Sequence, residues 1–162
     1  MFLDLRLKIS NDRDTRSSMT DWIKQAAQRT KAKRDKREQH GRAMKAQLSG
    51  FWTAFYSTIK NAVQEFNDEE GMGQIVKVEQ ASAASFTVSV RGGSGGSKLE
   101  VNVDPEKGIV RYTYTNPPGT SPGFLFFDVD SSGVLCFKYN EQQKSREEVA
   151  RILLEPLFDV VY

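Results

Sequence analysis

Short runs rich in β-branched and aromatic residues alternate with turn sequences between residues 74 and 140. Only a few residues separate most consecutive runs, which is too little chain for the crossover that a parallel pair of strands needs. We therefore expect an antiparallel meander of about six strands. The expected strands are 74–80, 85–91, 97–103, 109–115, 123–129 and 133–139.

The strands differ in how polar their two faces are. In the run 109–115, Arg111, Thr113 and Thr115 alternate with apolar or aromatic residues, so one face of the sheet should contact water. The last two runs do not alternate and carry apolar residues on both sides. This surplus predicts an apolar interface with a partner or a second copy. Its candidate residues are Leu125, Phe127, Leu135 and Phe137.

The first ten residues, "MFLDLRLKIS", also alternate between apolar and polar positions. A period of two is typical of a half-buried strand. We expect an N-terminal strand and polar turn over 1–17, as a possible addition to the sheet. Ser18, with Asp21 three residues later, predicts the start of a helix.

Helical periodicity extends over residues 18–67. One apolar stripe contains Met19, Trp22 and Ile23, and a longer one runs at three-to-four spacing from Met44 to Phe66. The pair Ser49-Gly50 is a plausible break, so either one helix or two fit the pattern.

A second helix is expected over 145–161, because Ser145 and Glu148 form a capping-box pattern ahead of an apolar stripe. Pro156 should kink or end this helix. The predicted fold class is α+β in a single domain over 1–162. In it, the long N-terminal helical segment and the C-terminal helix pack on an antiparallel sheet over 74–140.

Composition favours a soluble, cytoplasmic protein. The single cysteine, Cys136, cannot form an internal disulfide, which favours a reducing compartment. No signal peptide is evident, because charged residues interrupt the first ten positions. No apolar run approaches the ~20 residues that span a bilayer, so we expect no membrane contact.

The charges are unevenly distributed along the chain. Residues 29–45 contain eight Lys or Arg against Asp35 and Glu38, a net charge of +6, whereas residues 46–162 contain ten basic and fifteen acidic residues, a net charge of −5. The basic stretch fits a solvated helix, an acidic protein partner or nucleic acid. The candidate contact residues are Arg29, Lys33, Arg34, Lys36 and Arg37.

Two motifs resemble ligand-binding loops only in part. The segment "RGGSGGSKL" places Ser97 before Lys98 and Leu99 after it, and a strand follows, so it does not match a phosphate-binding P-loop. The segment "DVDSSGVL" begins like a calcium loop, but Tyr139 occupies the twelfth position, where a carboxylate is required. A hairpin in which Gly133 has a positive φ explains this second segment without a metal.

No pattern for catalysis is evident. His40 is the only histidine and has no nucleophile or orienting carboxylate near it in the sequence. Cys136 lies in an apolar strand, where packing as a small hydrophobe is expected. A zinc site needs more Cys and His ligands than this chain provides. We expect no cofactor and no metal.

The sequence thus favours a non-enzymatic interaction or oligomerising protein, whose partner is another protein or a second copy. One alternative is nucleic-acid binding through the basic stretch 29–45. Another is a small-molecule-binding protein or enzyme with a pocket between the sheet and its helices.

Overall fold

The computed structural model describes residues 2–70, 73–91, 96–116 and 120–161. The chain divides into two units, residues 1–41 and residues 42–162. Helix α1 (Phe2–Glu70) begins in the first unit and ends in the second.

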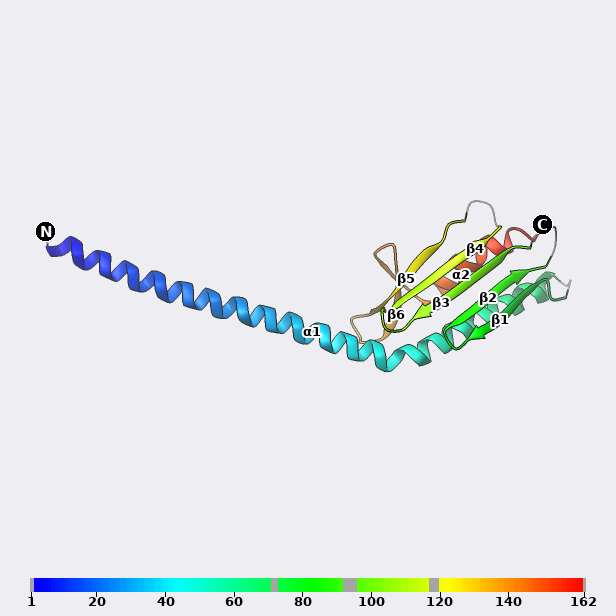
Figure 1. Cartoon of the computed structure of the whole chain (residues 1–162), viewed down its shortest axis with the longest axis horizontal. Helices are drawn as coiled ribbons and strands as arrows, with labels where there is room; N and C mark the ends of the chain where they lie inside the picture. The colour runs from blue at the N-terminus through cyan, green and yellow to red at the C-terminus, as the bar shows by residue number, and fades with distance from the viewer. Residues whose placement is uncertain (1, 71–72, 92–95, 117–119, 162) are drawn as a thin grey trace. The chain divides into compact units, whose positions relative to one another are not determined.

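The unit 42–162 is built on one antiparallel sheet (Figure 1). Its seven strands are hydrogen-bonded in the order in which they occur in the chain, as in a simple meander. The strands are β1 (Val76–Ser82), β2 (Ser85–Val90), β3 (Lys98–Asp104), β4 (Ile109–Thr115), β5 (Gly123–Val129), β6 (Leu135–Tyr139) and β7 (Gln142–Lys144).

The predicted meander is confirmed, and each of the six expected strands overlaps one of β1 to β6. The sequence pattern did not reveal β7, because its three residues are all polar. The turn before β6 follows the prediction as well, since Gly133 has a φ of 79°. A glycine adopts this left-handed conformation without the steric penalty of a Cβ atom.

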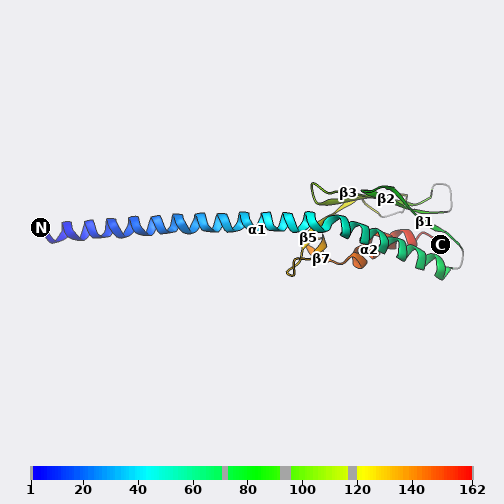
Figure 2. The same ribbon diagram turned by 90° about the horizontal axis from the view of Figure 1, so that it is seen from below.

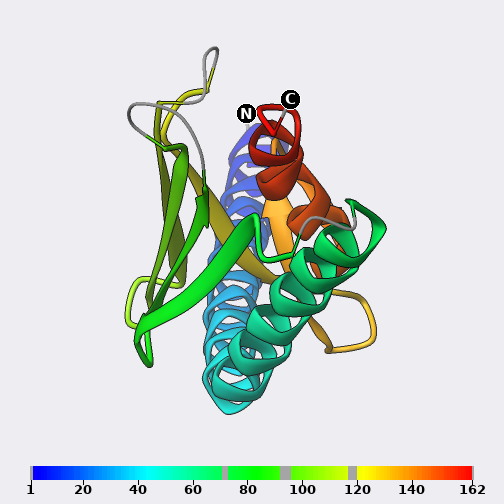
Figure 3. The same ribbon diagram turned by 90° about the vertical axis from the view of Figure 1, so that its right-hand side faces the viewer.

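Both helices cover the same face of the sheet. The C-terminal part of α1 and helix α2 (Arg146–Phe158) lie side by side, below β1, β2 and β3 in Figure 2, and Figure 3 shows the helices beside these strands from the end. The fold is therefore α+β with two layers, as predicted. The opposite face of the sheet carries the polar residues that the pattern indicated, and Arg111, Thr113 and Thr115 are all exposed there.

Aromatic residues hold α1 on the sheet. Phe55 is fully buried, and its ring centre lies 4.8 Å from that of Phe137 on β6. Trp52 packs against Phe86 on β2, with ring centres 5.6 Å apart. The buried apolar residues among the described side chains of α1 form one stripe at three-to-four spacing. They are Leu48, Trp52, Phe55, Ile59 and Val63.

Three polar side chains fix the position of α1 relative to the sheet. The indole N–H of Trp52 donates to the carbonyl of Ala83 (3.1 Å). Buried Asn67 donates to the carbonyl of Val76 (2.9 Å) and accepts from the same residue's N–H (3.1 Å). Gln47 bridges the turn before β6 by donating to one backbone carbonyl and accepting from one backbone N–H. Burial of these groups is tolerated because each has a partner.

The capping box at the start of α2 is confirmed. The Ser145 hydroxyl accepts from the Glu148 N–H (3.1 Å), and the Glu148 carboxylate accepts from the Ser145 N–H (2.7 Å). These backbone and side-chain hydrogen bonds to Ser145 lower the pKa of Glu148. Pro156 lies inside the helix, which ends at Phe158, so the predicted termination follows the proline by two residues.

The N-terminal strand expected within residues 1–17 does not form. Residues 2–17 belong to α1, and the described sheet contains no strand from this segment. The segment contains no Gly or Pro to break a helix, and its Leu, Arg and Lys residues are good helix formers. The alternation alone was insufficient, because a strand also needs a neighbouring strand to pair with.

Helix α1 is also not interrupted at Ser18 or at Ser49-Gly50, so 18–48 and 51–66 belong to one helix. A glycine inside a helix costs about 1 kcal/mol relative to alanine. On both sides of Gly50, buried side chains such as Leu48 and Trp52 anchor the helix to the sheet and offset this cost.

Candidate functional site

The four residues predicted to form an apolar interface lie in the core. Leu125 and Phe137 are fully buried, and Phe127 and Leu135 are 5% and 3% exposed. These side chains face α1, where Phe51 packs on both Phe127 and Phe137. A partner cannot contact them in this structure, which corrects the assignment of the interface to these positions.

The opposite face of the same strand carries exposed aromatic side chains. Phe124 and Phe126 on β5 are 54% and 49% exposed. Arg111 on β4 is paired with Phe124 in the strand register, and its guanidinium lies 5.8 Å from the ring centre. On the other side, Lys138 is paired with Phe126 and forms an ion pair with Glu141 (3.3 Å). We call Phe124 and Phe126 the sheet patch.

The basic stretch is helical and faces water. All five predicted contact residues are exposed, which are Arg29, Lys33, Arg34, Lys36 and Arg37. Arg34 also forms an ion pair with Glu38 at 3.9 Å, one of the pairs expected of a solvated helix. The structure therefore brings these cations together on one exposed segment of α1 without assigning them a ligand.

An exposed apolar stripe precedes the basic stretch on α1. Met19, Trp22 and Ile23 are 64%, 61% and 55% exposed. At helical spacing these three side chains share one face, and Lys33 and Arg37 continue that face in the next turns. We call Met19, Trp22 and Ile23 the helix stripe.

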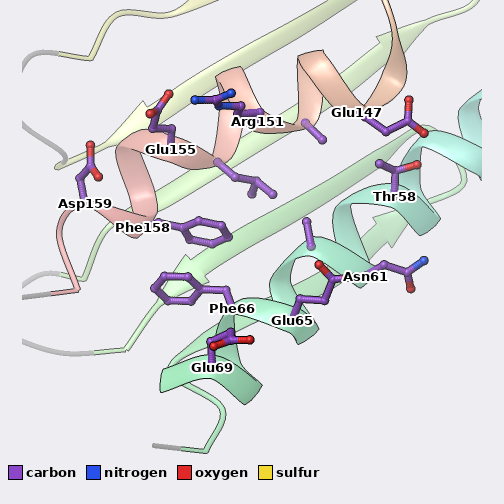
Figure 4. Close-up of a pocket in the computed structure, with 13 residues that line it drawn as sticks. Thr58, Asn61, Glu65, Phe66, Glu69, Glu147, Arg151, Glu155, Phe158 and Asp159 are labelled. Carbon is purple, nitrogen blue, oxygen red and sulfur yellow. The ribbon is translucent and has the colours of Figure 1, made fainter. Parts of the chain in front are cut away.

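A groove with a volume of about 730 Å³ lies between the C-terminal part of α1 and α2 (Figure 4). Its apolar surface includes Phe66 and Phe158, whose rings stack with centres 4.0 Å apart and planes 7° apart. Ala62, Ala150 and Leu154 contribute the other apolar lining residues. A volume of this size lies within the ~300–1,000 Å³ typical of ligand pockets.

The edges of this groove are acidic. Each stacked aromatic has carboxylates one and three residues away in the chain. Arg151 is the single basic lining residue, so the groove has a net charge of −4. We call this site the acidic groove. Its exposed carboxylates are Glu65, Glu69, Glu147, Glu155 and Asp159.

Sequence reasoning did not find the acidic groove, because residues from two distant segments line it. A partial signal was present in the pairs Glu65–Glu69 and Glu155–Asp159 at i,i+4 spacing. Like charges at this spacing destabilise a helix slightly. Two such pairs therefore suggest a role other than stabilising the fold.

The carboxylates of the calcium-like segment accept hydrogen bonds from the protein itself. Asp130 accepts from the backbone N–H groups of Ser132 and Val134, at 2.8 Å and 3.0 Å. Asp128 accepts from the Val129 N–H and from the Gln143 amide. Within the described residues, no group of three or more His, Cys, Asp or Glu side chains has the arrangement of a metal site.

The other candidates for chemistry lie on different elements of the chain. Cys136 is a free, half-buried thiol, and burial together with Asp128 and Asp130 raises its pKa, which disfavours the reactive thiolate. His40 is half-buried on α1. In the segment compared with a P-loop, residues 92–95 lie outside the described residues, whereas Lys98 and Leu99 lie on β3.

Comparisons of the chain with protein-family models, curated proteins and solved structures give no match. Among the described residues, no helix is both long and apolar enough to cross a lipid bilayer.

Proposed function

We propose that this protein is a non-enzymatic interaction protein that associates with a second copy of itself through exposed apolar side chains. The observation that supports the proposal is the placement of the large exposed apolar residues. In the described part of the chain, five of these six residues form the helix stripe and the sheet patch, and the sixth, Val134, lies in the turn before β6. Concentration of apolar surface in patches is typical of interaction sites.

The types of residue in the two patches also suit an interface. Aromatic residues such as Trp22 and Phe124 are enriched at the centres of protein interfaces, and tryptophan most often carries a large share of the binding energy. One of the two cations beside the sheet patch is balanced by a carboxylate, since Lys138 pairs with Glu141. This balance favours a protein surface over a phosphate backbone as the ligand of the patch.

A reducing compartment is part of the proposal. The only cysteine is half-buried and unpaired, which suits a protein of the cytoplasm.

The proposal includes no enzymatic activity, and the lining of a second pocket supports this. The charged residue lining a second pocket, of about 500 Å³ beside Trp52, is Lys45, and no acid–base pair lines that pocket.

Sedimentation velocity of the full-length chain over a dilution series tests the proposal. We expect reversible association that weakens roughly tenfold in Trp22→Ala/Ile23→Ala or in Phe124→Thr/Phe126→Thr, because apolar anchors are lost. Gln28→Ala is the matched control, since Gln28 is exposed on the same helix but lies away from the stripe. A wild-type chain that stays monomeric at every concentration would contradict the proposal.

Nucleic-acid binding is the second candidate, and the exposure of all five candidate cations of the basic stretch favours it. It predicts retention on heparin or DNA at low salt, with loss of retention when Lys33, Arg34, Lys36 and Arg37 are replaced by Gln. No retention of the wild-type chain at low salt would remove this candidate.

A further inference from the structure

We infer that the acidic groove binds residues 19–37 of a second copy of the chain. This inference rests on the proposed self-association and names the two surfaces that meet. It follows from an apolar groove edged by carboxylates in the unit 42–162, and from an exposed helical segment with the complementary chemistry in residues 18–41.

The groove is suited to a helix. It runs along α1 between Thr58 and Glu69, eleven residues apart, which corresponds to about 16 Å at 1.5 Å per residue. Trp22 and Lys33 are also eleven residues apart, so the part of the helical segment between them has the length of the groove. An amphipathic helix bound in a groove by anchors at i, i+3 and i+4 is a recurring mode of recognition, and the helix stripe has this spacing.

The charges of the two surfaces indicate which segment occupies the groove. The groove has five carboxylates against Arg151, whereas residues 29–45 have eight basic residues against Asp35 and Glu38. Lys33 and Arg37 share the helix face of the apolar stripe, so a helix that inserts Trp22 directs these cations toward the groove as well. Complementary charges of this kind guide association and fix the register of two surfaces.

The same charges disfavour the simpler arrangement, in which the helix stripes of two copies pair with each other. Two copies of a segment with a net charge of +6 would repel wherever their basic stretches approach. In the groove, by contrast, the bound cations reduce the repulsion between Glu65 and Glu69 and between Glu155 and Asp159. Contact between two different surfaces forms a reciprocal dimer, a closed ring or an open chain of copies.

Charge reversal in the full-length chain tests this inference. The helix variant is Lys33→Glu/Arg37→Glu, and the groove variant is Glu65→Lys/Glu155→Lys; all four positions are exposed, so the fold should tolerate the changes. We expect each variant alone to associate roughly tenfold more weakly than the wild type in sedimentation velocity. An equimolar mixture should recover association, because the unchanged basic helix of the groove variant can bind the unchanged acidic groove of the helix variant.

Matched controls separate docking from a change in overall charge. Lys24→Glu/Lys31→Glu makes the same change on the opposite face of the helix. Glu79→Lys/Glu106→Lys makes it away from the groove, in the sheet and its turn. Both controls should associate like the wild type. If circular dichroism shows that the groove variant is unfolded, Glu69→Lys/Asp159→Lys replaces it, because this variant reverses one carboxylate on each edge of the same groove.

Three results would overturn the inference. One is a mixture that associates no better than the separate variants, because an unchanged helix and an unchanged groove would then fail to bind each other. Another is association that resists both reversals but is lost in Phe124→Thr/Phe126→Thr, which would retain the proposed function and assign it to the sheet patch. A third is a strictly monomeric wild type, which would remove the proposed function as well.

Discussion

Two segments of one helix differ in what surrounds them. In residues 48–63 of α1, side chains at three-to-four spacing are buried against the sheet, and Phe55 and Ile59 are completely inaccessible to solvent. In residues 18–39, apart from half-buried Ala26, every residue is exposed, Trp22 and Ile23 among them. Both segments have apolar residues at helical spacing, yet only one of them is part of the core.

This difference shows that an apolar stripe indicates a surface that can be buried, and not what buries it. The segment 48–63 contributes to the free energy of folding, because its side chains leave water when the sheet forms. The segment 18–41 is stabilised by its own hydrogen bonds and by pairs such as Arg34–Glu38. We therefore expect changes in the first segment to affect stability, and changes in the second to affect association.

The largest expected effect comes from truncating the buried segment. Phe55→Ala should lower the free energy of unfolding by about 3–5 kcal/mol, because it removes a fully buried ring that packs on Phe137. Trp22→Ala is the counterpart in the exposed segment and should change it by less than about 0.5 kcal/mol. Urea unfolding of both variants, followed by circular dichroism, measures this contrast. Equal losses would show that Trp22 is buried in the folded monomer.

An intermediate effect is expected at alkaline pH in the unit 42–162. Burial and the neighbouring tyrosines Tyr112 and Tyr139 raise the pKa of Tyr114 above its ordinary value of 10, and burial together with Tyr139 raises the pKa of Tyr112 to about 12. The folded state therefore keeps protons that the unfolded chain releases. The contribution of these two tyrosines to stability should be constant below pH 10 and should decrease as the pH rises from 10 through 12.

Tyr114→Phe isolates this contribution. The variant should lose about 1 kcal/mol at neutral pH, because the Tyr114 hydroxyl donates to the Leu153 carbonyl on α2 (2.8 Å). Its stability should then decrease less than that of the wild type above pH 10. A parallel decrease in both proteins, measured by urea unfolding at several pH values, would assign the alkaline loss to other groups.

The smallest expected effect is in the exposed segment. Glu38→Gln removes the ion pair with Arg34 and should cost about 0.3–0.5 kcal/mol of local helix stability. High salt should abolish the difference between variant and wild type, because both side chains are largely exposed. Thermal loss of far-UV circular dichroism at low and high salt measures it. A loss above 1 kcal/mol would indicate that Glu38 has a further partner.

The sheet was the part of the fold most accessible to sequence reasoning. Strands β4 and β5 have the bounds that the pattern predicted, because each is a run of β-branched and aromatic residues bounded by turn residues. The N-terminal segment shows the limit of the same reasoning. Leu3, Leu5 and Leu7 alternate as in a strand, but whether such a segment pairs depends on a neighbour that local sequence does not specify.

The candidate site shows a similar limit. The surplus of apolar residues on β5 was recognised, but the side that faces the helices was not, so Leu125 and Phe127 were assigned to the surface in place of Phe124 and Phe126. A shift of one residue exchanges the two faces of a strand. The acidic groove was missed altogether, because its two edges come from segments far apart in the chain, Thr58 to Glu69 and Glu147 to Asp159.

The sequence by itself determined six of the seven strands, their antiparallel order, the capping box of α2 and the separation of charge along the chain. These features depend on periodicity and on neighbours within a few residues. Only the tertiary structure decided which face of β5 is buried and that α1 and α2 lie beside each other with their carboxylates along one groove. These features depend on contacts between distant segments, whose geometry is set when the apolar surfaces of the whole chain leave water together.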